Sequence, residues 1–281
     1  MPYTTLVSTD DLAQHLQDNT WRVFDCRHDL AKPELGATQY AESHIPGALH
    51  AHMDRDLATQ PNGHNGRHPL PTPEAFAAWL GAQGLRPGDQ VVAYDGAGGT
   101  AAARLWWMLR WVGHAAVAVL DGGFAAWRAE GRPVTDALPR FAPSVYPVRP
   151  QASMHVGAAT LQAKLVGGDV VVLDARSAER FRGEVEPIDP VAGRIPGSHN
   201  RFCGLNLAAG GRFKPADELR KEFGALLAGR SPEAIVHSCG SGVAACHNQL
   251  AMEVAGLAGS RIYPGSWSEW IADPARPREK G

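Results

Sequence analysis

The chain has 281 residues, a length that suits one large domain or two domains of ordinary size. Its net charge of −2 and pI near 6.6 provide no basic surface for nucleic acid or for an acidic membrane. No apolar run approaches the roughly 20 residues of a membrane-spanning helix, and the first residues lack a signal-peptide pattern. We therefore expect neither nucleic acid nor a membrane as a partner.

The cysteine content argues against a disulfide-rich or zinc-binding protein. Four cysteines are too few for a disulfide framework at this length, and their spacings match no zinc pattern, so no metal is expected. Free thiols are typical of a reducing compartment, which makes the cytoplasm the expected location. The four cysteines are Cys26, Cys203, Cys239 and Cys246.

Short apolar strands alternate with helical stretches from the N-terminus onwards. Residues 10–16 form an expected amphipathic helix after a capping Ser8 or Thr9, and residues 21–27 read as a buried strand. A second apolar strand over residues 90–94 precedes a tryptophan-rich helix. Alternation of this kind predicts the α/β class, with a mainly parallel sheet covered by helices.

Four landmarks occur twice, in the same order and at a nearly constant spacing. They are an Asp-x-Arg pair, an Ile-Pro-Gly triplet, a glycine-rich loop after a strand, and a closing Gly-x-x-x-Trp or Gly-Ser-Trp segment. The chain is therefore predicted to contain two copies of one domain. The paired positions are Asp25 with Asp174, Ile45 with Ile195, Asp95 with Cys239, and Gly123 with Gly265.

A proline-rich stretch separates the two copies. Prolines are dense between residues 132 and 150, and such a segment is extended and semi-rigid. We place an N-terminal domain at residues 1–135, a linker at 136–152 and a C-terminal domain at 153–281.

The segment from Ala234 to Cys246 carries the clearest chemical signal. An apolar run ends at Cys239, Gly240 and Gly242 follow, and a helix-forming stretch begins at once. This order predicts a strand, a tight loop and a helix N-terminus, where inward N–H groups and the helix dipole favour a thiolate. Ligands of parallel sheets bind at the carboxyl ends of the strands. Cys239 is therefore the candidate nucleophile, with a buried structural cysteine as the alternative.

The repeated motifs together resemble the rhodanese family of sulfurtransferases. The sequence Cys-Gly-Ser-Gly-Val-x-Ala from Cys239 resembles the branch of that family that uses 3-mercaptopyruvate. The resemblance implies two tandem rhodanese-like domains, of which the N-terminal one has lost its cysteine; Asp95 stands at that position. It implies transfer of sulfane sulfur from 3-mercaptopyruvate, through a Cys239 persulfide, to a small thiol, cyanide or a thioredoxin-like acceptor. No cofactor is implied.

Donor preference is expected to follow the charge of the loop. Family members that prefer thiosulfate carry basic residues directly after the cysteine, whereas Gly240 and Ser241 are neutral and suit a monoanion such as 3-mercaptopyruvate. Ala244 replaces the threonine that is usual in this loop. The loop residues assigned to donor binding are Gly240, Gly242, Val243 and Ala244.

Arg180 matches the arginine that binds the donor carboxylate in the family, and a guanidinium suits a bidentate carboxylate clamp. The alternative is a surface arginine paired with Glu179 or Glu184. Relatives often carry a second substrate arginine shortly afterwards, but residues 184–190 contain none. Arg194 is the candidate substitute.

A polar loop of the N-terminal copy, residues 62–71, is expected to contribute to catalysis. By resemblance, Asp54, His68 and Ser241 form a proton relay in which Asp54 orients His68. His68 then helps Ser241 to take the proton of the substrate thiol. The alternative is that Asp54 and His68 are ordinary surface residues.

Three other functions remain as alternatives. Thiosulfate sulfurtransferase is the runner-up within the same enzyme class. A non-catalytic rhodanese-like binding or sensing module is the second. A phosphatase is disfavoured because its loop needs an arginine to hold phosphate, and the loop after Cys239 has only Gly, Ser, Val and Ala.

Overall fold

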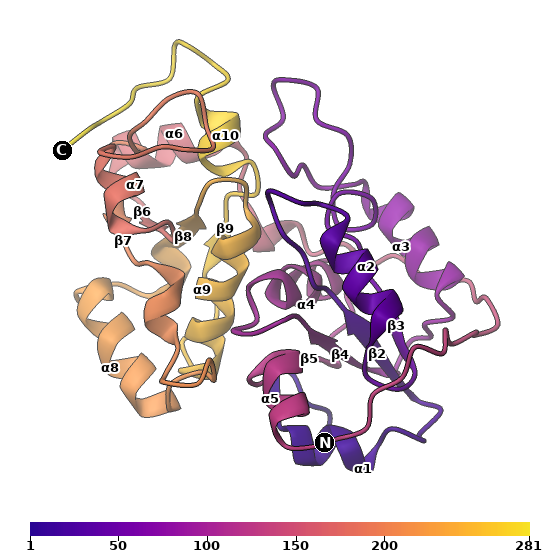
Figure 1. Cartoon of the computed structure of the whole chain (residues 1–281). Coiled ribbons are helices and arrows are strands. Elements are labelled where there is room, and N and C mark those ends of the chain that lie inside the picture. Colours follow the sequence, from indigo (N-terminus) through magenta and orange to yellow (C-terminus); the bar gives the residue numbers. More distant parts are fainter. The chain divides into compact units, whose positions relative to one another are not determined.

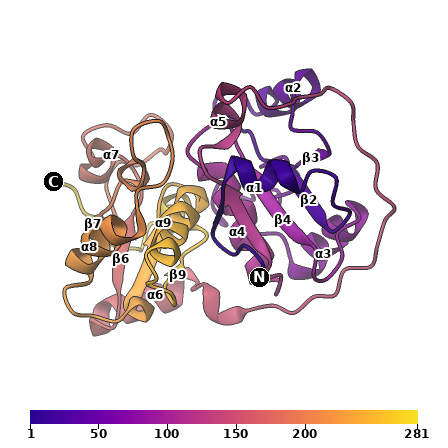
Figure 2. The same cartoon turned by 90° about the horizontal axis from the view of Figure 1, so that it is seen from below.

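The computed structural model describes all 281 residues, which pack into two compact units. Each unit includes one short segment that is flanked in sequence by residues of the other unit. No sequence pattern predicts this exchange. Both units are built on a parallel sheet flanked by helices (Figures 1 and 2). Unit 1 comprises Met1–Thr59, Leu70–Gln151 and Leu207–Phe213, and unit 2 comprises Gln60–Pro69, Ala152–Asn206 and Lys214–Gly281.

Unit 1 has a five-stranded sheet in the order β1-β5-β4-β2-β3, and every paired strand runs parallel. The central strands are short apolar runs buried on both faces, as parallel sheets require. The strands are β1 (Leu6–Val7), β2 (Trp21–Asp25), β3 (Ala48–His50), β4 (Gln90–Tyr94) and β5 (Val117–Leu120), and the helices are α1 (Thr9–Gln14), α2 (Leu35–Glu42), α3 (Pro73–Ala82), α4 (Thr100–Trp111) and α5 (Gly123–Ala129).

Local sequence explains where these helices begin and what they bury. Thr72 caps α3 by accepting the N–H of Ala75 at 3.2 Å, and Pro73 occupies the first turn, where its missing N–H costs nothing. The tryptophans of α4 are core residues, as expected of large apolar side chains on a buried helix. Trp107 and Trp111 stack with their ring centroids 5.8 Å apart.

Unit 2 has a four-stranded sheet in the order β7-β6-β8-β9, again with parallel pairs. Its amphipathic α8 buries Leu219, Phe223 and Leu227, which lie on one helical face. The strands are β6 (Val171–Asp174), β7 (His199–Asn200), β8 (Ile235–Ser238) and β9 (Arg261–Ile262); the α-helices are α6 (Ala158–Gly167), α7 (Ala178–Arg182), α8 (Ala216–Leu227), α9 (Val243–Val254) and α10 (Ser266–Trp270), and the 3₁₀ helices are Ala152–Met154, Cys203–Asn206 and Pro232–Ala234.

The two sheets have the same topology. A parallel bridge from His155 to Ile262 adds a fifth position beside β9, just as β1 lies beside β5. Asp25 is in register with Tyr94, and Asp174 with Ser238, so Asp95 and Cys239 follow equivalent strand ends. The predicted pair of α/β domains is confirmed.

Residues 136–151 contain no helix or strand, in keeping with their proline content. The segment is fixed to unit 1 at its end, where Gln151 donates its N–H to the carbonyl of Trp111 at 2.7 Å. None of the helices is both long enough and apolar enough to cross a bilayer.

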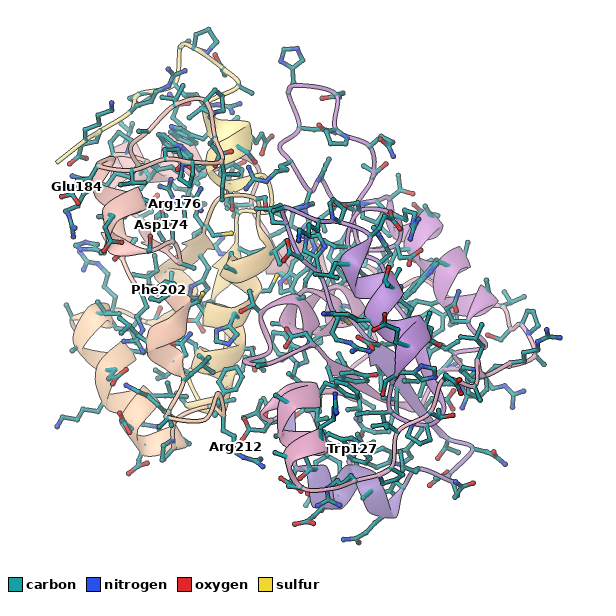
Figure 3. The ribbon with its side chains drawn as sticks, viewed as in Figure 1. Trp127, Asp174, Arg176, Glu184, Phe202 and Arg212 are labelled. Atoms are coloured by element: carbon teal, nitrogen blue, oxygen red, sulfur yellow. The ribbon has the colours of Figure 1, made fainter.

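Each Asp-x-Arg motif forms a buried ion pair at the end of a strand. Arg27 binds Asp25 through Nε and Nη2 at 2.5–3.0 Å, and Nη2 also donates to the carbonyl of Ser43. Arg176 binds Asp174 in the same way at 2.8–3.1 Å (Figure 3). The motif therefore fixes the chain direction as it leaves β2 and β6, because neither buried charge tolerates losing its partner.

Asp95, at the position equivalent to Cys239, is a structural carboxylate. It accepts the N–H groups of Gly99, Ala101 and Ala102 at 2.8–3.3 Å, near the start of α4. Burial raises the pKa of Asp95 to about 6, although these N–H groups oppose the shift. The N-terminal copy thus places a fixed anion where the C-terminal copy has its thiol.

We expect the stability of the wild type relative to Asp95→Asn to fall as pH rises. The folded-state pKa lies above the unfolded value of 3.8, so the contribution of Asp95 is greatest below pH 4 and is lost through pH 6. A shift of this size corresponds to up to about 3 kcal/mol. Denaturant titrations of both proteins from pH 4 to pH 7 measure it, and a difference independent of pH would contradict the assignment.

Candidate active site

Cys239 lies between the end of β8 and the start of α9, as predicted. Its side chain is almost buried, at 3% exposure, and Sγ accepts the N–H of Gly242 at 3.1 Å. At the residue immediately before α9, the loop therefore directs a backbone donor at the sulfur. The arrangement stabilises negative charge on Sγ.

Gly242 is the residue that makes this turn possible. It has φ +82, in the left-handed region, and a Cβ there would lie 2.1 Å from the carbonyl oxygen of Pro264. Cys246, one turn into α9, directs its thiol at the Gly242 carbonyl at 3.3 Å and so holds the next peptide group of the loop. Val243 and Ala244, half-buried, form the first turn of α9.

Segment 265–268 closes the loop from the opposite side. Ser266 accepts the N–H of Cys239 at 3.0 Å, and Trp267 and Ser268 donate their N–H groups to the carbonyls of Cys239 and Gly240. Ser266 has φ +52, an unusual conformation for a residue other than glycine. The sequence analysis missed Ser266, although it lies inside the repeated Gly-Ser-Trp landmark.

Ser241 and His68 are brought together. The Oγ of Ser241 and Nδ1 of His68 lie 2.8 Å apart, and both side chains are buried. His68 reaches this position because Gln60–Pro69 packs as part of unit 2. Gly66 passes so close to Gly265 that a Cβ would lie 2.9 Å from its carbonyl oxygen, and the N–H of Arg67 donates to Ser268.

Asp54 lies in unit 1, in the turn that follows β3. Its N–H donates to Nδ1 of His52 at 3.2 Å, and its charge raises the pKa of His28 against the larger lowering effect of burial. Its predicted role toward His68 stays a prediction.

Arg180 is held by two carboxylates rather than by Glu179 or Glu184. Its Nη2 donates to Glu186 at 2.7 Å and to Asp189 at 3.2 Å, and its Nε donates to both oxygens of Glu186 at 3.2 Å. Glu186 also binds Arg176, which connects Arg180 to the buried ion pair at the end of β6.

Arg67 is a site residue that the sequence analysis missed. Its Nη1 donates to Asp189 at 2.5 Å. A Cβ on Gly240 would lie 2.9 Å from Nη2 of Arg67 and 3.6 Å from Nη2 of Arg180. The residues directly after Cys239 are neutral, but two arginines reach Gly240 from elsewhere in unit 2, so the charge next to the loop is not set by its own side chains alone.

Arg194 is engaged at another place in unit 2. Its guanidinium pairs with Glu279 and donates to the carbonyl of Gly281, and it lies 4.8 Å from the centroid of the Phe181 ring. These contacts fix the last residues of the chain. They bring Arg194 to neither Gly240 nor Asp189.

The other two cysteines are poor nucleophiles. Burial raises the pKa of Cys203 to about 12, with the charge of Cys239 adding to the effect, and burial raises that of Cys26 well above its usual range. His237, next to the loop, is also structural: burial lowers its pKa to about 3, and its Nε2 lies 3.1 Å from Ser260.

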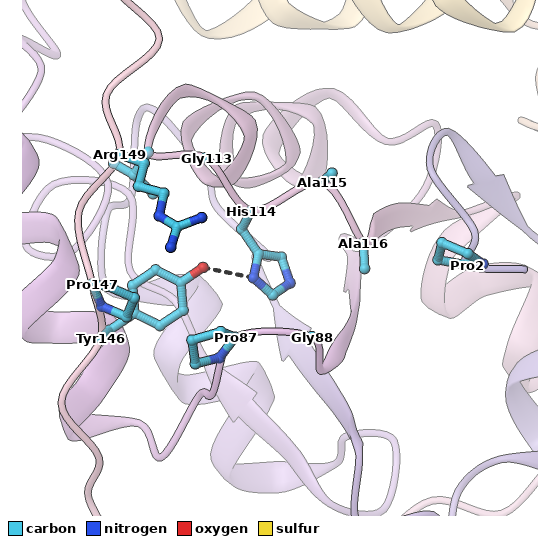
Figure 4. A pocket seen from close by; sticks show the side chains of 11 residues that line it. Pro2, Pro87, Gly88, Gly113, His114, Ala115, Ala116, Tyr146, Pro147 and Arg149 are labelled. Carbon is cyan, nitrogen blue, oxygen red and sulfur yellow. Dashed lines mark hydrogen bonds between the residues drawn. The ribbon is translucent and has the colours of Figure 1, made fainter.

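A cavity of about 320 Å³ in unit 1 contains no group suited to covalent chemistry (Figure 4). His114 uses both ring nitrogens there, with Nδ1 2.7 Å from the Tyr146 hydroxyl and Nε2 2.9 Å from the Asp89 carbonyl. No group of three or more His, Cys, Asp or Glu side chains is placed to hold a metal ion. The loop after Cys239 is the candidate active site because it combines a backbone donor at Sγ with the buried Ser241–His68 contact.

We expect Gly242→Ala to abolish any activity of Cys239 while weakening the fold, because its Cβ overlaps the Pro264 carbonyl. Gly224→Ala is the matched control: Gly224 lies within α8 with open space at its Cβ position, so alanine there should stabilise by up to about 1 kcal/mol. Thermal unfolding and thiol-alkylation rates of Cys239 measure both effects. Wild-type alkylation kinetics in Gly242→Ala would contradict the assignment.

The comparisons with known proteins agree with this geometry. A Pseudomonas aeruginosa protein named as a probable 3-mercaptopyruvate sulfurtransferase is 48% identical over 283 residues, covering 100% of both chains. The thiosulfate/3-mercaptopyruvate sulfurtransferase 2 of Arabidopsis thaliana is 36% identical over 297 residues, covering 97% of this chain and 85% of that protein. A solved structure of 3-mercaptopyruvate sulfurtransferase from Leishmania major superposes with a TM-score of 0.84 at 30% identity, covering 98% of this chain and 75% of that one. Residues 8–130 and 157–273 each match the Rhodanese-like domain, and the chain belongs to that family.

Proposed function

We propose that this protein is a 3-mercaptopyruvate sulfurtransferase with Cys239 as the sulfur carrier. The observation that carries the proposal is the Cys239 loop, in which the Gly242 N–H meets Sγ and Ser241 lies in hydrogen-bond contact with His68. Relatives named for this activity support the choice of donor.

In the first half-reaction, the Cys239 thiolate attacks the sulfur of 3-mercaptopyruvate. A new S–S bond forms, the carbon–sulfur bond of the donor breaks, and its electron pair leaves on carbon as the enolate of pyruvate. The Gly242 N–H stabilises the charge on Sγ before transfer. The keto group of the donor stabilises this leaving group, because the negative charge on carbon is delocalised onto the carbonyl oxygen.

Ser241 and His68 handle the proton of this step. The donor thiol gives its proton through the Ser241 hydroxyl to His68, and the same proton then reaches the enolate carbon to give pyruvate. The balance leaves a Cys239 persulfide and needs no oxidant. In the proposed relay Asp54 orients His68.

In the second half-reaction, a nucleophile attacks the outer sulfur of the persulfide and regenerates Cys239. A small thiol, cyanide or a thioredoxin-like protein has the required nucleophilicity. A reducing compartment such as the cytoplasm is the proposed setting, since all four cysteines are free thiols.

Thiosulfate is the second candidate donor. Two observations favour testing thiosulfate as a donor. One relative is named for both donors, and two arginines, which could bind an anion, lie beside Gly240. Those arginines are neutralised by Glu186 and Asp189, so the site has no surplus positive charge for a dianion. We therefore expect a higher kcat/KM for 3-mercaptopyruvate than for thiosulfate.

Cys239→Ser should lose sulfur transfer completely, because a serine hydroxyl forms no persulfide. Mass spectrometry of the wild type after treatment with 3-mercaptopyruvate should find one added sulfur atom on the peptide containing Cys239. Cys203→Ser is the control and should keep its activity. Added sulfur on Cys203 or Cys246 instead would overturn the assignment, and so would failure of the wild type to release pyruvate.

The relay predicts different effects for the two donors. Ser241→Ala and His68→Gln should each lower kcat for 3-mercaptopyruvate by roughly a hundredfold, and the double variant should lose little more. Thiosulfate brings no thiol proton, so its turnover should change far less. His64→Gln, on the exposed part of the same segment, is the control. Equal losses with both donors would assign the pair a structural role.

A further inference from the structure

The side chain of Asp189 lies between two arginines. Its Oδ1 accepts from Nη1 of Arg67 at 2.5 Å, and its Oδ2 accepts from Nη2 of Arg180 at 3.2 Å. The Asp189 side chain is only 4% exposed. Asp189 thus receives one hydrogen bond from each of two arginines. A bound molecule with a carboxylate would receive the same hydrogen bonds if it took the place of the Asp189 side chain.

The Arg67–Asp189–Arg180 contact lies next to Gly240, in the loop after Cys239. Measured from a Cβ built on Gly240, Nη2 of Arg67 is 2.9 Å away, and Nη2 of Arg180 and Oδ2 of Asp189 are each 3.6 Å away. Gly240 directly follows Cys239. A three-carbon donor with its sulfur at Cys239 therefore has both arginines within reach of its far end.

Arg67 has an unused donor at this place. Its Nε is buried and has no hydrogen-bond partner, although a buried N–H group without an acceptor destabilises the folded state. Its Nη1 binds Asp189 and its backbone N–H binds Ser268, so one contact holds the guanidinium and the other holds the main chain from which it extends. An incoming carboxylate would supply the missing acceptor.

Asp189 can leave without dismantling the site. Glu186 holds Arg180 through both Nε and Nη2, and it also accepts the backbone N–H of Asp189 at 3.1 Å. Rotation of the Asp189 side chain therefore leaves Arg180 held by Glu186, and a donor carboxylate would replace the contacts that Arg67 and Arg180 lose. Burial raises the pKa of Asp189 against the opposing charge of Arg67, so its carboxylate regains favourable hydration when it moves outward.

We propose that Asp189 occupies the place of the donor carboxylate in the resting enzyme, and that the donor displaces it to bind between Arg67 and Arg180. The inference rests on the proposed function, since it takes the donor to be a small carboxylate. Arg67 is then the second substrate arginine that residues 184–190 do not provide. Exchange of one carboxylate for another leaves the local charge unchanged, which favours a monoanionic donor over thiosulfate.

Kinetics of two single variants and their combination test the exchange. Asp189→Asn keeps the side-chain size and removes the competing charge, so KM for 3-mercaptopyruvate should fall by roughly fivefold with kcat little changed. Arg67→Gln should raise KM by roughly ten- to a hundredfold. In the double variant Arg67→Gln/Asp189→Asn, the asparagine should no longer lower KM relative to Arg67→Gln alone, because the second arginine is absent.

Binding of pyruvate separates this proposal from the proposed function. Calorimetric titration of pyruvate into Cys239→Ser variants needs no turnover, and it should give tighter binding with Asp189→Asn and weaker binding with Arg67→Gln. The controls are Arg182→Gln and Glu184→Gln, an exposed ion pair on the neighbouring helix end, and both should match Cys239→Ser alone.

The outcomes are distinct. If Asp189→Asn raises KM and weakens pyruvate binding, Asp189 only positions the arginines and the exchange is wrong. If no variant binds pyruvate, the carboxylate site is wrong. If pyruvate binding follows the expected order while the wild type fails to turn over 3-mercaptopyruvate, the carboxylate site stands and the proposed function fails.

Discussion

A series of ion pairs, in which arginines alternate with carboxylates, connects the end of β6 to the loop after Cys239. Arg176 and Arg180 each contact the carboxylates on either side, Arg67 contacts Asp189 at the end of the series, and most of these groups are nearly removed from water. Buried charges persist only with partners, so the position of each member depends on its neighbours. The Asp-x-Arg motif therefore does more than turn the chain, because in unit 2 it anchors the arginines that reach Gly240. In order, the members are Asp174, Arg176, Glu186, Arg180, Asp189 and Arg67.

The two copies show how one strand-end geometry serves two purposes. In unit 1 the anion is a carboxylate bound permanently by three backbone N–H groups of the following loop and helix. In unit 2 the equivalent position holds the Cys239 sulfur, which receives one N–H from Gly242, a glycine that no other residue replaces without overlap. The Asp95 carboxyl group satisfies these N–H groups and holds the turn in place. The copy with Cys239 has fewer backbone donors at this position and places there the sulfur that the proposed function uses.

Much of this was predictable from local sequence. The repeat, the α/β class and the position of Cys239 all follow from patterns that are close together in the chain. The proposed second substrate arginine does not follow from local sequence, because Arg194, the candidate that follows Arg180 along the chain, binds Glu279 instead. Arg67 lies in the other half of the sequence and reaches Gly240 only because its segment packs with unit 2. No periodicity, cap or turn signal encodes such a placement.

Gln60–Pro69 packs with unit 2, and this placement determines which parts of the sequence the proposed active site needs. Arg67 and His68 are adjacent in sequence, and one binds Asp189 while the other contacts Ser241. A single segment thus delivers the proposed carboxylate ligand and the proposed proton acceptor to the same loop. Gly66 permits this close approach, since a Cβ there would overlap the Gly265 carbonyl. A fragment that begins after the proline-rich stretch would keep Cys239 and Arg180 but would lack both groups, so Asp189 and Ser241 would each lose a buried partner. In the proposed mechanism the half of the sequence without Cys239 therefore supplies two groups to the site of the other half, even though its own strand end holds only Asp95.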